Sequence, residues 1–370
     1  MSDEKFMQLA LNLAKETIGQ TSPNPVVGAV IVKDGDIVGF GAHFKTGEKH
    51  AEVHAIHMAG DEARGSTLYV TLEPCSHQGR TPPCTDLIIK SGVRRVVIAA
   101  KDPNKQVNGI KILQAAGIDV KTGVLQDEAQ KINALFFHFI KTKRPYVTLK
   151  TAMSLDGKIA TKTGESKWIT GKTARFDAHT YRHSHDGILV GVETVIADDP
   201  SLTTRLKVGA GRNPVRIILD THLRTPLDAS VITDPEASTW IIVGNKVTEE
   251  AKKLFLQSDQ VRIIQLKDET IRIPEVLDVL GQNEITSLFV EGGATVNGSF
   301  LQEKMFNQLI VYMAPKLIGG YGAPTSFLGT GFASLAEVPS LSILQVEQVG
   351  EDIKIVATYK GEESYVYRDC

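Results

Sequence analysis

The chain has 370 residues, about two and a half times the length of a typical domain, so its length predicts two domains. Apolar residues make up 42% and charged residues 23%, a composition that excludes a wholly disordered chain. The net charge is only −2, with 41 Lys and Arg against 43 Asp and Glu. Since this charge provides no strong positive field for phosphate backbones, we expect no nucleic-acid partner.

Cysteine usage predicts a reducing compartment. The three cysteines, Cys75, Cys84 and Cys370, are too few for a disulfide framework, which leaves Cys75 and Cys84 free to bind a metal. The first residues are acidic, unlike those of a signal peptide, and no apolar run approaches the ~20 residues of a membrane span. We therefore expect a soluble cytoplasmic protein with no membrane partner.

The first half of the chain alternates between helical and extended patterns. Apolar spacing predicts a helix over residues 6–14, and Asp34-Gly35 between two β-rich runs predicts a hairpin. The other expected elements are strands over 26–32, 37–41, 68–72, 96–100 and 118–120, and helices over 50–60, 84–90, 109–116 and 127–140. Such alternation predicts helices that cover a central sheet.

A charged stretch ending in proline, residues 141–145, marks the expected boundary between a domain of residues 1–145 and one of residues 146–370. The alternation then restarts. The expected elements are strands over 146–151, 188–190, 215–220, 240–243, 261–266, 288–290, 309–314 and 353–359, and helices over 173–182, 248–256, 274–280 and from about 295. This pattern predicts a second α/β domain.

The strongest local signal is a set of metal-ligand residue types. His50 and Glu52 form an H-x-E motif, and Cys75 and Cys84 follow with eight residues between them. One imidazole and two thiolates leave the fourth tetrahedral position to water, as in a catalytic zinc site, and zinc brings the pKa of that water to ~7. Glu52 could then carry a proton to a leaving amine. Since positions i and i+2 do not share a helix face, His50 and Glu52 should lie where a helix begins.

Other interpretations of these residues stay open. The cysteines could belong to a structural zinc knuckle instead. Cys84 follows two prolines and should begin a helix whose dipole favours its thiolate. His54 could complete the ligand set, although packing or substrate contact suits it better, because a fourth ligand would close the site. His77 could contact substrate or stabilise its loop, and Asn24 could hydrogen-bond a pyrimidine edge or stabilise a turn.

Seven motifs span both halves of the chain: SPNPVVGAV at 22–30, HAEVHA at 50–55, TLEPCSHQGRTPPC at 71–84, SLDGK at 154–158, SKWIT at 166–170, ADDPSLT at 197–203 and VEGG at 290–293. Through these motifs the whole chain resembles the bifunctional riboflavin biosynthesis deaminase/reductases. The eight-residue cysteine spacing distinguishes this family from deaminases with the P-C-x-x-C signature. The resemblance implies a cytidine-deaminase-like α/β/α sandwich followed by a dihydrofolate-reductase-like α/β domain, with zinc and NADPH as cofactors.

The resemblance implies two successive reactions on a small pyrimidine nucleotide. Zinc on His50, Cys75 and Cys84, with Glu52 as proton shuttle, would remove the 2-amino group of 2,5-diamino-6-ribosylamino-4(3H)-pyrimidinone 5′-phosphate. NADPH would then reduce the ribosyl side chain, giving 5-amino-6-(ribitylamino)uracil 5′-phosphate. Related enzymes assemble, so we expect a homo-oligomer. The alternative is a zinc nucleotide deaminase whose second domain is non-catalytic and binds a partner.

The second half carries weaker signals of its own. No G-x-G-x-x-G follows a strand, and the Gly-Gly turn after the strand over 288–290 could admit a phosphate or be a plain connection. The resemblance implies NADPH contacts at Ala152, Trp168, Thr194, Asp198, Thr221, Gly293, Ala294, Thr295, Val296, Asn297, Gly298 and Ser299. It implies substrate contacts at Ser166, Arg182, Leu202, Arg205 and Glu291.

Residue chemistry agrees with parts of this assignment. Arg182 and Arg205 are suited to clamp the ribose 5′-phosphate, although each could instead be a salt-bridged surface residue. Glu291 could orient the sugar or cap a helix. Because the nicotinamide carries the hydride chemistry, we expect no single indispensable acid or base in this half.

Overall fold

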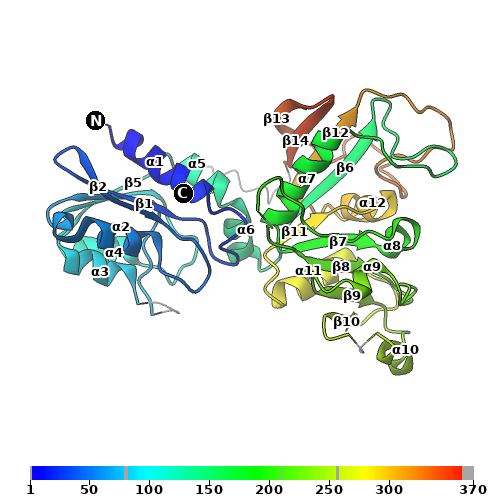
Figure 1. The fold of residues 1–370 in the computed structure, drawn as a ribbon, viewed down its shortest axis with the longest axis horizontal. Helices are drawn as coiled ribbons and strands as arrows, with labels where there is room; N and C mark the ends of the chain where they lie inside the picture. The colour runs from blue at the N-terminus through cyan, green and yellow to red at the C-terminus, as the bar shows by residue number, and fades with distance from the viewer. Residues whose placement is uncertain (1, 79–81, 210, 256–257, 361–370) are drawn as a thin grey trace. The chain divides into compact units, whose positions relative to one another are not determined.

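The computed structural model of the chain describes residues 2–78, 82–209, 211–255 and 258–360. Contacts divide it into two units, Met1–Thr142 and Lys143–Cys370, which are described separately below (Figure 1). The domain boundary expected after residue 145 stays a prediction. Residues 79–81 of the cysteine motif and Leu256 of an expected helix lie outside the described residues.

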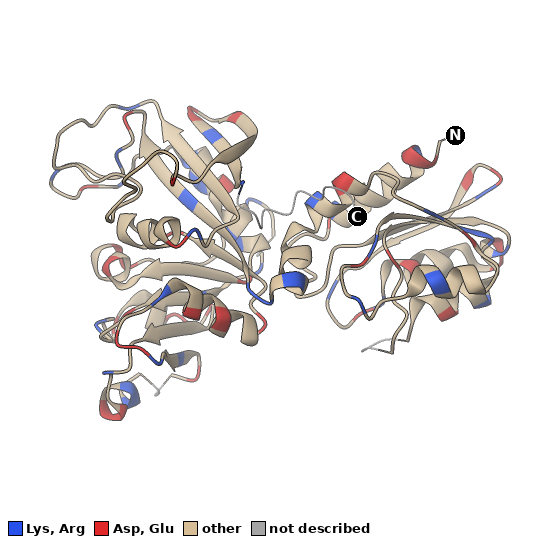
Figure 2. Cartoon of the chain, turned by 180° about the vertical axis from the view of Figure 1, so that it is seen from behind, with Lys and Arg blue, Asp and Glu red and all other residues tan. Residues whose placement is uncertain are grey.

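Two further expectations concern the whole chain. Basic and acidic residues are interspersed over the helices and strands of both units (Figure 2), in keeping with the small net charge. None of the helices among the described residues has the length and apolar character needed to cross a membrane.

The first unit is a five-stranded sheet with helices on both faces. Its strands are β1 (Gly28–Lys33), β2 (Asp36–Ala42), β3 (Thr67–Leu72), β4 (Arg95–Ala100) and β5 (Asp119–Thr122). Its helices are α1 (Asp3–Lys15), α2 (Ala51–Ala59), the 3₁₀ turn η1 (Gly60–Ala63), α3 (Cys84–Ser91), α4 (Gly109–Ala115), α5 (Gln126–Ile132) and α6 (Ala134–Thr142). The strand order is β2-β1-β3-β4-β5, with α2, α3 and α4 on one face and α1 and α5 on the other (Figure 1). The expected α/β/α sandwich is confirmed.

The hairpin between β1 and β2 forms where the Asp-Gly pair predicts it. Asp34 and Gly35 have φ values of 51° and 95°, and Lys33 pairs with Asp36 across the turn. Two consecutive positive φ angles match the strand twist, and Asp and Gly tolerate them best. The local sequence therefore fixes the register of this hairpin.

Helix α2 lies unusually close to strand β2 because β2 carries glycines on the facing side. A Cβ atom at Gly39 would lie 2.2 Å from the carbonyl oxygen of Ala55, and one at Gly41 would lie 2.4 Å from Cβ of His54. No larger residue fits at either position without moving the helix. This close packing sets the position of the first turn of α2, which carries Glu52.

The expectation of one helix over residues 127–140 is wrong. The helix ends at Asn133, and α6 begins directly after it. The buried Asn133 side chain accepts a hydrogen bond from Val26 N–H at 2.8 Å and donates one to Val26 O at 2.9 Å. It therefore pairs with the backbone as a neighbouring strand would, and this tertiary contact accompanies the break in the helix.

The second unit contains a nine-stranded sheet. Its strands are β6 (Tyr146–Ser154), β7 (Gly187–Gly191), β8 (Val215–Leu219), β9 (Thr239–Val243), β10 (Val261–Gln265), β11 (Ser287–Val290), β12 (Gln308–Ala314), β13 (Leu341–Val349) and β14 (Asp352–Tyr359). Its helices are α7 (Lys172–Ser184), α8 (Val192–Asp198), α9 (Ser230–Thr233), α10 (Glu249–Lys253), α11 (Ile273–Gln282) and α12 (Ala294–Gln302). The expected second α/β domain is confirmed, but sequence patterning missed β13, α8 and α9.

The strand order is β10-β9-β8-β7-β11-β6-β12-β14-β13, and the pairs from β10 to β12 are parallel. One apolar core holds α7, α8 and α9 against the sheet, and another holds α11 and α12. Parallel strands place all their carboxyl ends at one edge of a sheet, where ligands of open α/β folds bind. The segments after β7, β8 and β11 therefore share that edge.

We expect Gly39→Ala to destabilise the first unit by roughly 1–3 kcal/mol, because its Cβ would overlap the backbone of α2. In urea unfolding followed by far-UV circular dichroism, the variant should lose the signal of the first unit at a lower urea concentration than the starting protein does. Both tryptophans, Trp168 and Trp240, lie in the second unit, so the midpoint followed by tryptophan fluorescence should not change. Gly322→Ala is the control, since a Cβ there meets no atom within 4 Å. An unchanged dichroism curve for Gly39→Ala would contradict the close packing.

Candidate zinc and reductase sites

Three elements of the first unit bring the expected zinc ligands together. His50 is the residue that precedes α2, Cys75 follows β3, and Cys84 is the first residue of α3. The Nδ1 atom of His50 lies 3.3 Å from Sγ of Cys84 and 3.5 Å from Sγ of Cys75, and all three donor atoms lie within 4.8 Å of one another. Tetrahedral zinc with ordinary bond lengths separates N and S ligands by about 3.5 Å. The donor set therefore fits a zinc ion.

The negative charge of the cysteine pair lies on Cys75, not on Cys84. A hydrogen bond from the Cys84 thiol lowers the pKa of Cys75 to about 4, and the first N–H of α3, on Cys84, also donates to the Cys75 sulfur at 3.3 Å. The same thiol hydrogen bond, together with burial, raises the pKa of Cys84. The expectation that Cys84 begins a helix is confirmed, and the first N–H group of that helix points to the Cys75 sulfur; that the helix dipole favours a metal-bound Cys84 thiolate stays a prediction. Metal binding has to displace the Cys84 proton.

Glu52 lies in the first turn of α2, beside the same ligands. Only 3% of its surface is exposed, and this burial raises the pKa of its carboxyl group. A raised pKa makes the carboxylate a stronger proton acceptor, and an acid–base catalyst must accept a proton before it can pass it on.

A histidine that the sequence did not single out lies next to this site. The ring of His43, directly after β2, meets the ring of His50 edge-on at 5.2 Å. Its Nδ1 bonds to the Lys49 carbonyl at 3.2 Å, so Nδ1 carries the hydrogen and Nε2 accepts from the Asn24 amide at 3.1 Å. Burial lowers the pKa of His43, which keeps the ring neutral. This chain of bonds fixes the orientation of the Asn24 amide.

His54 does not join the ligands. Its ring packs edge-on against Phe44 at 5.3 Å, and among the described residues the metal-type cluster at this site consists of His50, Cys75 and Cys84.

A carboxyl group that the sequence did not single out is that of Asp102, whose pKa is raised by burial to about 6.

In the second unit, the expected substrate residues Arg182 and Glu291 form an ion pair. Arg182 Nε and Nη2 donate to the two carboxylate oxygens of Glu291 at 3.1 and 2.8 Å, and Nη1 donates to Thr203 O at 2.9 Å. Burial acts to raise the pKa of Glu291, but the charges of Arg182, Lys150 and His179 and the hydrogen bonds from Arg182 together outweigh burial and lower the pKa to about 2. Arg182 therefore forms a salt bridge, as its alternative interpretation expects, and three of its N–H groups hold the protein; its contact with the 5′-phosphate stays a prediction. Glu291 does not cap α12, since Gly293 has that position.

The other expected substrate residues differ in exposure. The Arg205 side chain is exposed, while its backbone N–H donates to His179 Nδ1 at 3.2 Å. Leu202 is only 3% exposed, and its side chain belongs to the core beneath α7 and α8. Ser166 is half-buried, two residues before Trp168. Arg205 is thus the expected phosphate ligand whose side chain faces solvent.

Trp168 is an exposed aromatic residue that other residues hold in place. Its side chain is 62% exposed, and the Arg175 guanidinium lies 4.3 Å from the ring centroid. Lys316 Nζ donates to the Trp168 carbonyl at 2.8 Å. The neighbouring Lys167 forms an ion pair with Asp198 at 3.3 Å, so two expected NADPH-binding segments meet here.

The remaining expected NADPH residues lie at the carboxyl edge of the sheet. Thr194 follows β7, Thr221 follows β8 and Ala152 lies on β6. A Cβ at Gly293, which precedes α12, would lie 3.7 Å from Oγ1 of Thr194, so these two segments are adjacent. The backbone N–H groups at the start of a helix can bind a phosphate.

Part of the expected stretch 293–299 faces the protein interior. Ala294 and Asn297 are buried, and the Asn297 amide donates to Ser326 O at 3.2 Å. A Cβ at Gly298 would lie 1.5 Å from Leu328 O, so this glycine packs against backbone. Thr295 and Ser299 are exposed and Val296 is half-buried.

Comparisons with known proteins match both units. Residues 1–100 match the cytidine and deoxycytidylate deaminase zinc-binding region, and residues 145–355 match the RibD C-terminal domain. Riboflavin biosynthesis protein RibD of Bacillus amyloliquefaciens is 53% identical over 98% of this chain and 99% of its own length. The Aquifex aeolicus protein of the same name is 48% identical over 95% and 97%. The solved structure of Acinetobacter baumannii RibD is 40% identical, with a TM-score of 0.87 over 96% of this chain and 98% of its own.

Together, the fold and the sites define a two-domain enzyme in which a zinc deaminase precedes an NADPH-dependent reductase. The chain belongs to the RibD family of riboflavin biosynthesis proteins. It is a bifunctional enzyme, and zinc and NADPH are its cofactors. The match of the second unit to the RibD C-terminal domain favours this function over a deaminase with a non-catalytic second domain.

We expect Cys84→Ser to lose stoichiometric zinc, because one of the three donors that fit the ion is then removed. Metal analysis of the purified protein measures this loss. His54→Gln is the matched control and should keep about one zinc per chain, since the His54 ring packs against Phe44 instead. Loss of zinc from His54→Gln would show that the ligand set has a fourth member.

Proposed function

We propose that the first unit deaminates 2,5-diamino-6-ribosylamino-4(3H)-pyrimidinone 5′-phosphate and that the second unit reduces the ribosyl chain of the product, giving 5-amino-6-(ribitylamino)uracil 5′-phosphate. A Thermotoga maritima structure described as a diaminohydroxyphosphoribosylaminopyrimidine deaminase/5-amino-6-(5-phosphoribosylamino)uracil reductase supports this substrate. It is 37% identical, with a TM-score of 0.86 over 96% of this chain. The observation that carries the deaminase proposal is a set of three zinc-type donors with the buried Glu52 beside them.

In the deaminase site, His50, Cys75 and Cys84 hold zinc, which supplies an acidified water when bound. Glu52 accepts a proton at its carboxylate and passes it to the departing amino group. Burial supports this role because it raises the pKa of the carboxyl group toward the working range. Asn24, whose NH₂ group is engaged by His43, offers its carbonyl oxygen to an N–H group on the pyrimidine edge.

In the reductase site, the protein supplies mainly geometry. NADPH supplies the hydride when bound. The backbone N–H groups of Gly293–Val296, at the first turn of α12, hold cofactor phosphate, and Trp168, Thr194, Asp198, Thr221 and Ala152 line the rest of its site. Glu291 stays ionised against Arg182 and orients the sugar hydroxyls, while the exposed Arg205 binds the 5′-phosphate.

We also propose that the enzyme is a cytoplasmic homo-oligomer. Strand β13 is an edge of the nine-stranded sheet and exposes Ile343, Leu344 and Val346 by about 60% or more. An unpaired strand edge with apolar side chains favours a second copy of the same strand. The thiol donors of the zinc site suit a reducing compartment.

We expect Glu52→Gln to keep zinc and fold while ammonia release falls by about 10²–10⁴-fold, because the proton carrier is lost. Release is measured by a coupled ammonia assay, and reduction of separately supplied deaminated nucleotide should be unchanged. Glu48→Gln, at an exposed position in the segment before α2, is the matched control. Ammonia release within a few-fold of the starting protein would refute the proposed role of Glu52.

We expect Val346→Lys to shift the protein toward monomers, because a charge on the β13 edge opposes apolar strand pairing. Light scattering coupled to size-exclusion chromatography gives the mass. Leu227→Lys, at another exposed apolar position of the second unit, should leave the mass unchanged. A monomeric starting protein would overturn the oligomer proposal.

A further inference from the structure

Thr204 lies beside Arg212 and Asn213, and these three residues form a neck. Thr204 N–H donates to the Asn213 side-chain oxygen at 2.8 Å, and Thr204 Oγ1 donates to Arg212 O at 2.8 Å. Arg205 is the first residue beyond this closed neck. The position of the Arg205 side chain therefore depends on where the neck is held.

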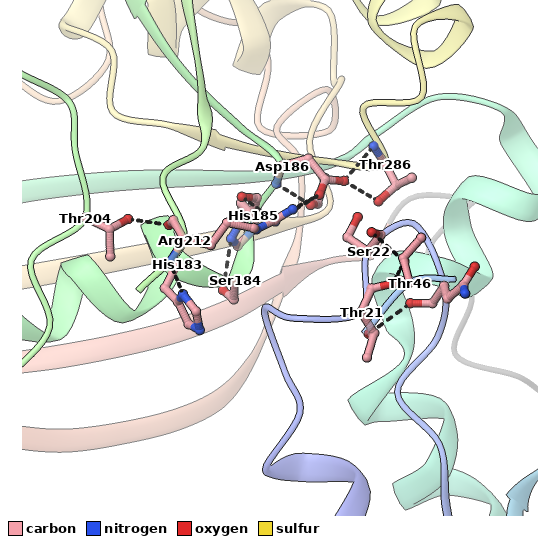
Figure 3. A network of polar contacts seen from close by, with 12 residues as sticks. Thr21, Ser22, Thr46, His183, Ser184, His185, Asp186, Thr204, Arg212 and Thr286 are labelled. Atoms are coloured by element: carbon pink, nitrogen blue, oxygen red, sulfur yellow. Dashed lines mark hydrogen bonds and ion pairs between the residues drawn. The ribbon is translucent and has the colours of Figure 1, made fainter. Parts of the chain in front are cut away.

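One face of α7 holds the neck through its backbone. Arg205 N–H donates to His179 Nδ1 at 3.2 Å. Arg212 N–H donates to His183 Nδ1 at 2.8 Å (Figure 3). Arg182, which lies between these histidines on the helix, donates to Thr203 O. Residues three and four apart on a helix are neighbours, so all three contacts come from one side. Burial lowers the pKa of His179 to about 4, so its ring is neutral and can accept the bond.

The Arg212 side chain fixes the neck to the sheet. Nη1 and Nη2 donate to one carboxylate oxygen of Asp186 at 3.0 and 2.9 Å, and Nη2 also donates to His185 O at 2.9 Å. The second oxygen of Asp186 accepts from the backbone N–H and the hydroxyl of Thr286 (Figure 3). Asp186 is only 7% exposed and directly precedes β7, while Thr286 directly precedes β11. Arg212 is thereby tied to two central strands.

We propose that Arg212, through its ion pair with Asp186, is a positioning residue for the phosphate-binding Arg205 of the reductase. The inference rests on the proposed role of Arg205. Among the described residues, the hydrogen bonds given for Arg212 go to His183, His185, Asp186 and Thr204, so Arg212 holds the neck from which Arg205 projects. A guanidinium displaced by about 1 Å from its anion binds much less well, so loss of the anchor raises the KM for the nucleotide more than it lowers kcat.

The test is steady-state reduction of the deaminated nucleotide by the full-length enzyme. We expect Arg212→Met to raise the KM for the nucleotide by at least about tenfold, with kcat within about threefold and unchanged NADPH affinity. Arg212→Lys should recover part of the loss, because it keeps the charge but not the fork. Deaminase activity of the same protein reports that the chain is folded. The matched control is Arg144→Met, which removes another forked pair, with Asp278, in the second unit.

A double-mutant cycle separates this proposal from the role of Arg205. If Arg212 acts through Arg205, the double variant Arg205→Gln/Arg212→Met has the same nucleotide KM as Arg205→Gln alone. An unchanged KM in Arg205→Gln refutes the phosphate role of Arg205. A raised KM in Arg205→Gln with an unchanged KM in Arg212→Met overturns the positioning role. Fully additive effects of the two substitutions on the KM also overturn the positioning role. So does an equal loss of nucleotide affinity, NADPH affinity and thermal stability in Arg212→Met, because it would show general unfolding of the unit.

Discussion

The deaminase half depends on one geometric constraint: three side chains from separate elements must bring their donor atoms within 4.8 Å. Two of them, His50 and Cys84, lie where α2 and α3 begin, and the third follows β3. Glycines on β2 allow α2 to lie against the sheet, which determines where its first turn begins. The N–H group at the start of α3 points at the Cys75 sulfur and stabilises its charge before any metal binds. The packing of α2 on β2 and the start of α3 thus position the zinc ligands.

The sequence predicted the residue types of this centre because ligand chemistry is local. An imidazole, two thiols and a carboxylate at fixed short spacings leave few alternatives, and the structure brings His50, Cys75, Cys84 and Glu52 together. The sequence could not predict which sulfur carries the charge, since that depends on which one the Cys84 N–H reaches. It could not predict His43 either, because only the hairpin fold places this residue beside His50.

In the reductase half, even more of the important contacts depend on tertiary structure and could not be predicted from the sequence. Most of its strands and helices follow from apolar periodicity, but β13 does not: a bulge near Leu344 interrupts the alternation, and both faces of the strand are largely exposed. The pairing of Arg182 with Glu291 joins residues 109 positions apart, and no motif marks them as partners. Their ion pair leaves an anionic carboxylate and only part of the arginine's hydrogen-bonding capacity. In the proposed function, Arg205 binds the 5′-phosphate, so the contacts that hold the backbone of Arg205 affect the affinity of the reductase for its nucleotide.

The bond between Asn133 and Val26 determines how short an independent deaminase can be. Val26 lies two residues after Asn24, and both of its backbone groups are satisfied by one amide that comes from beyond the last strand of the sheet. A fragment ending with α5 would retain every strand and every zinc ligand, yet it would leave the segment before β1 without its partner. The shortest deaminase fragment that keeps this contact must therefore include Asn133, although the last strand of the sheet and the last zinc ligand come earlier in the sequence.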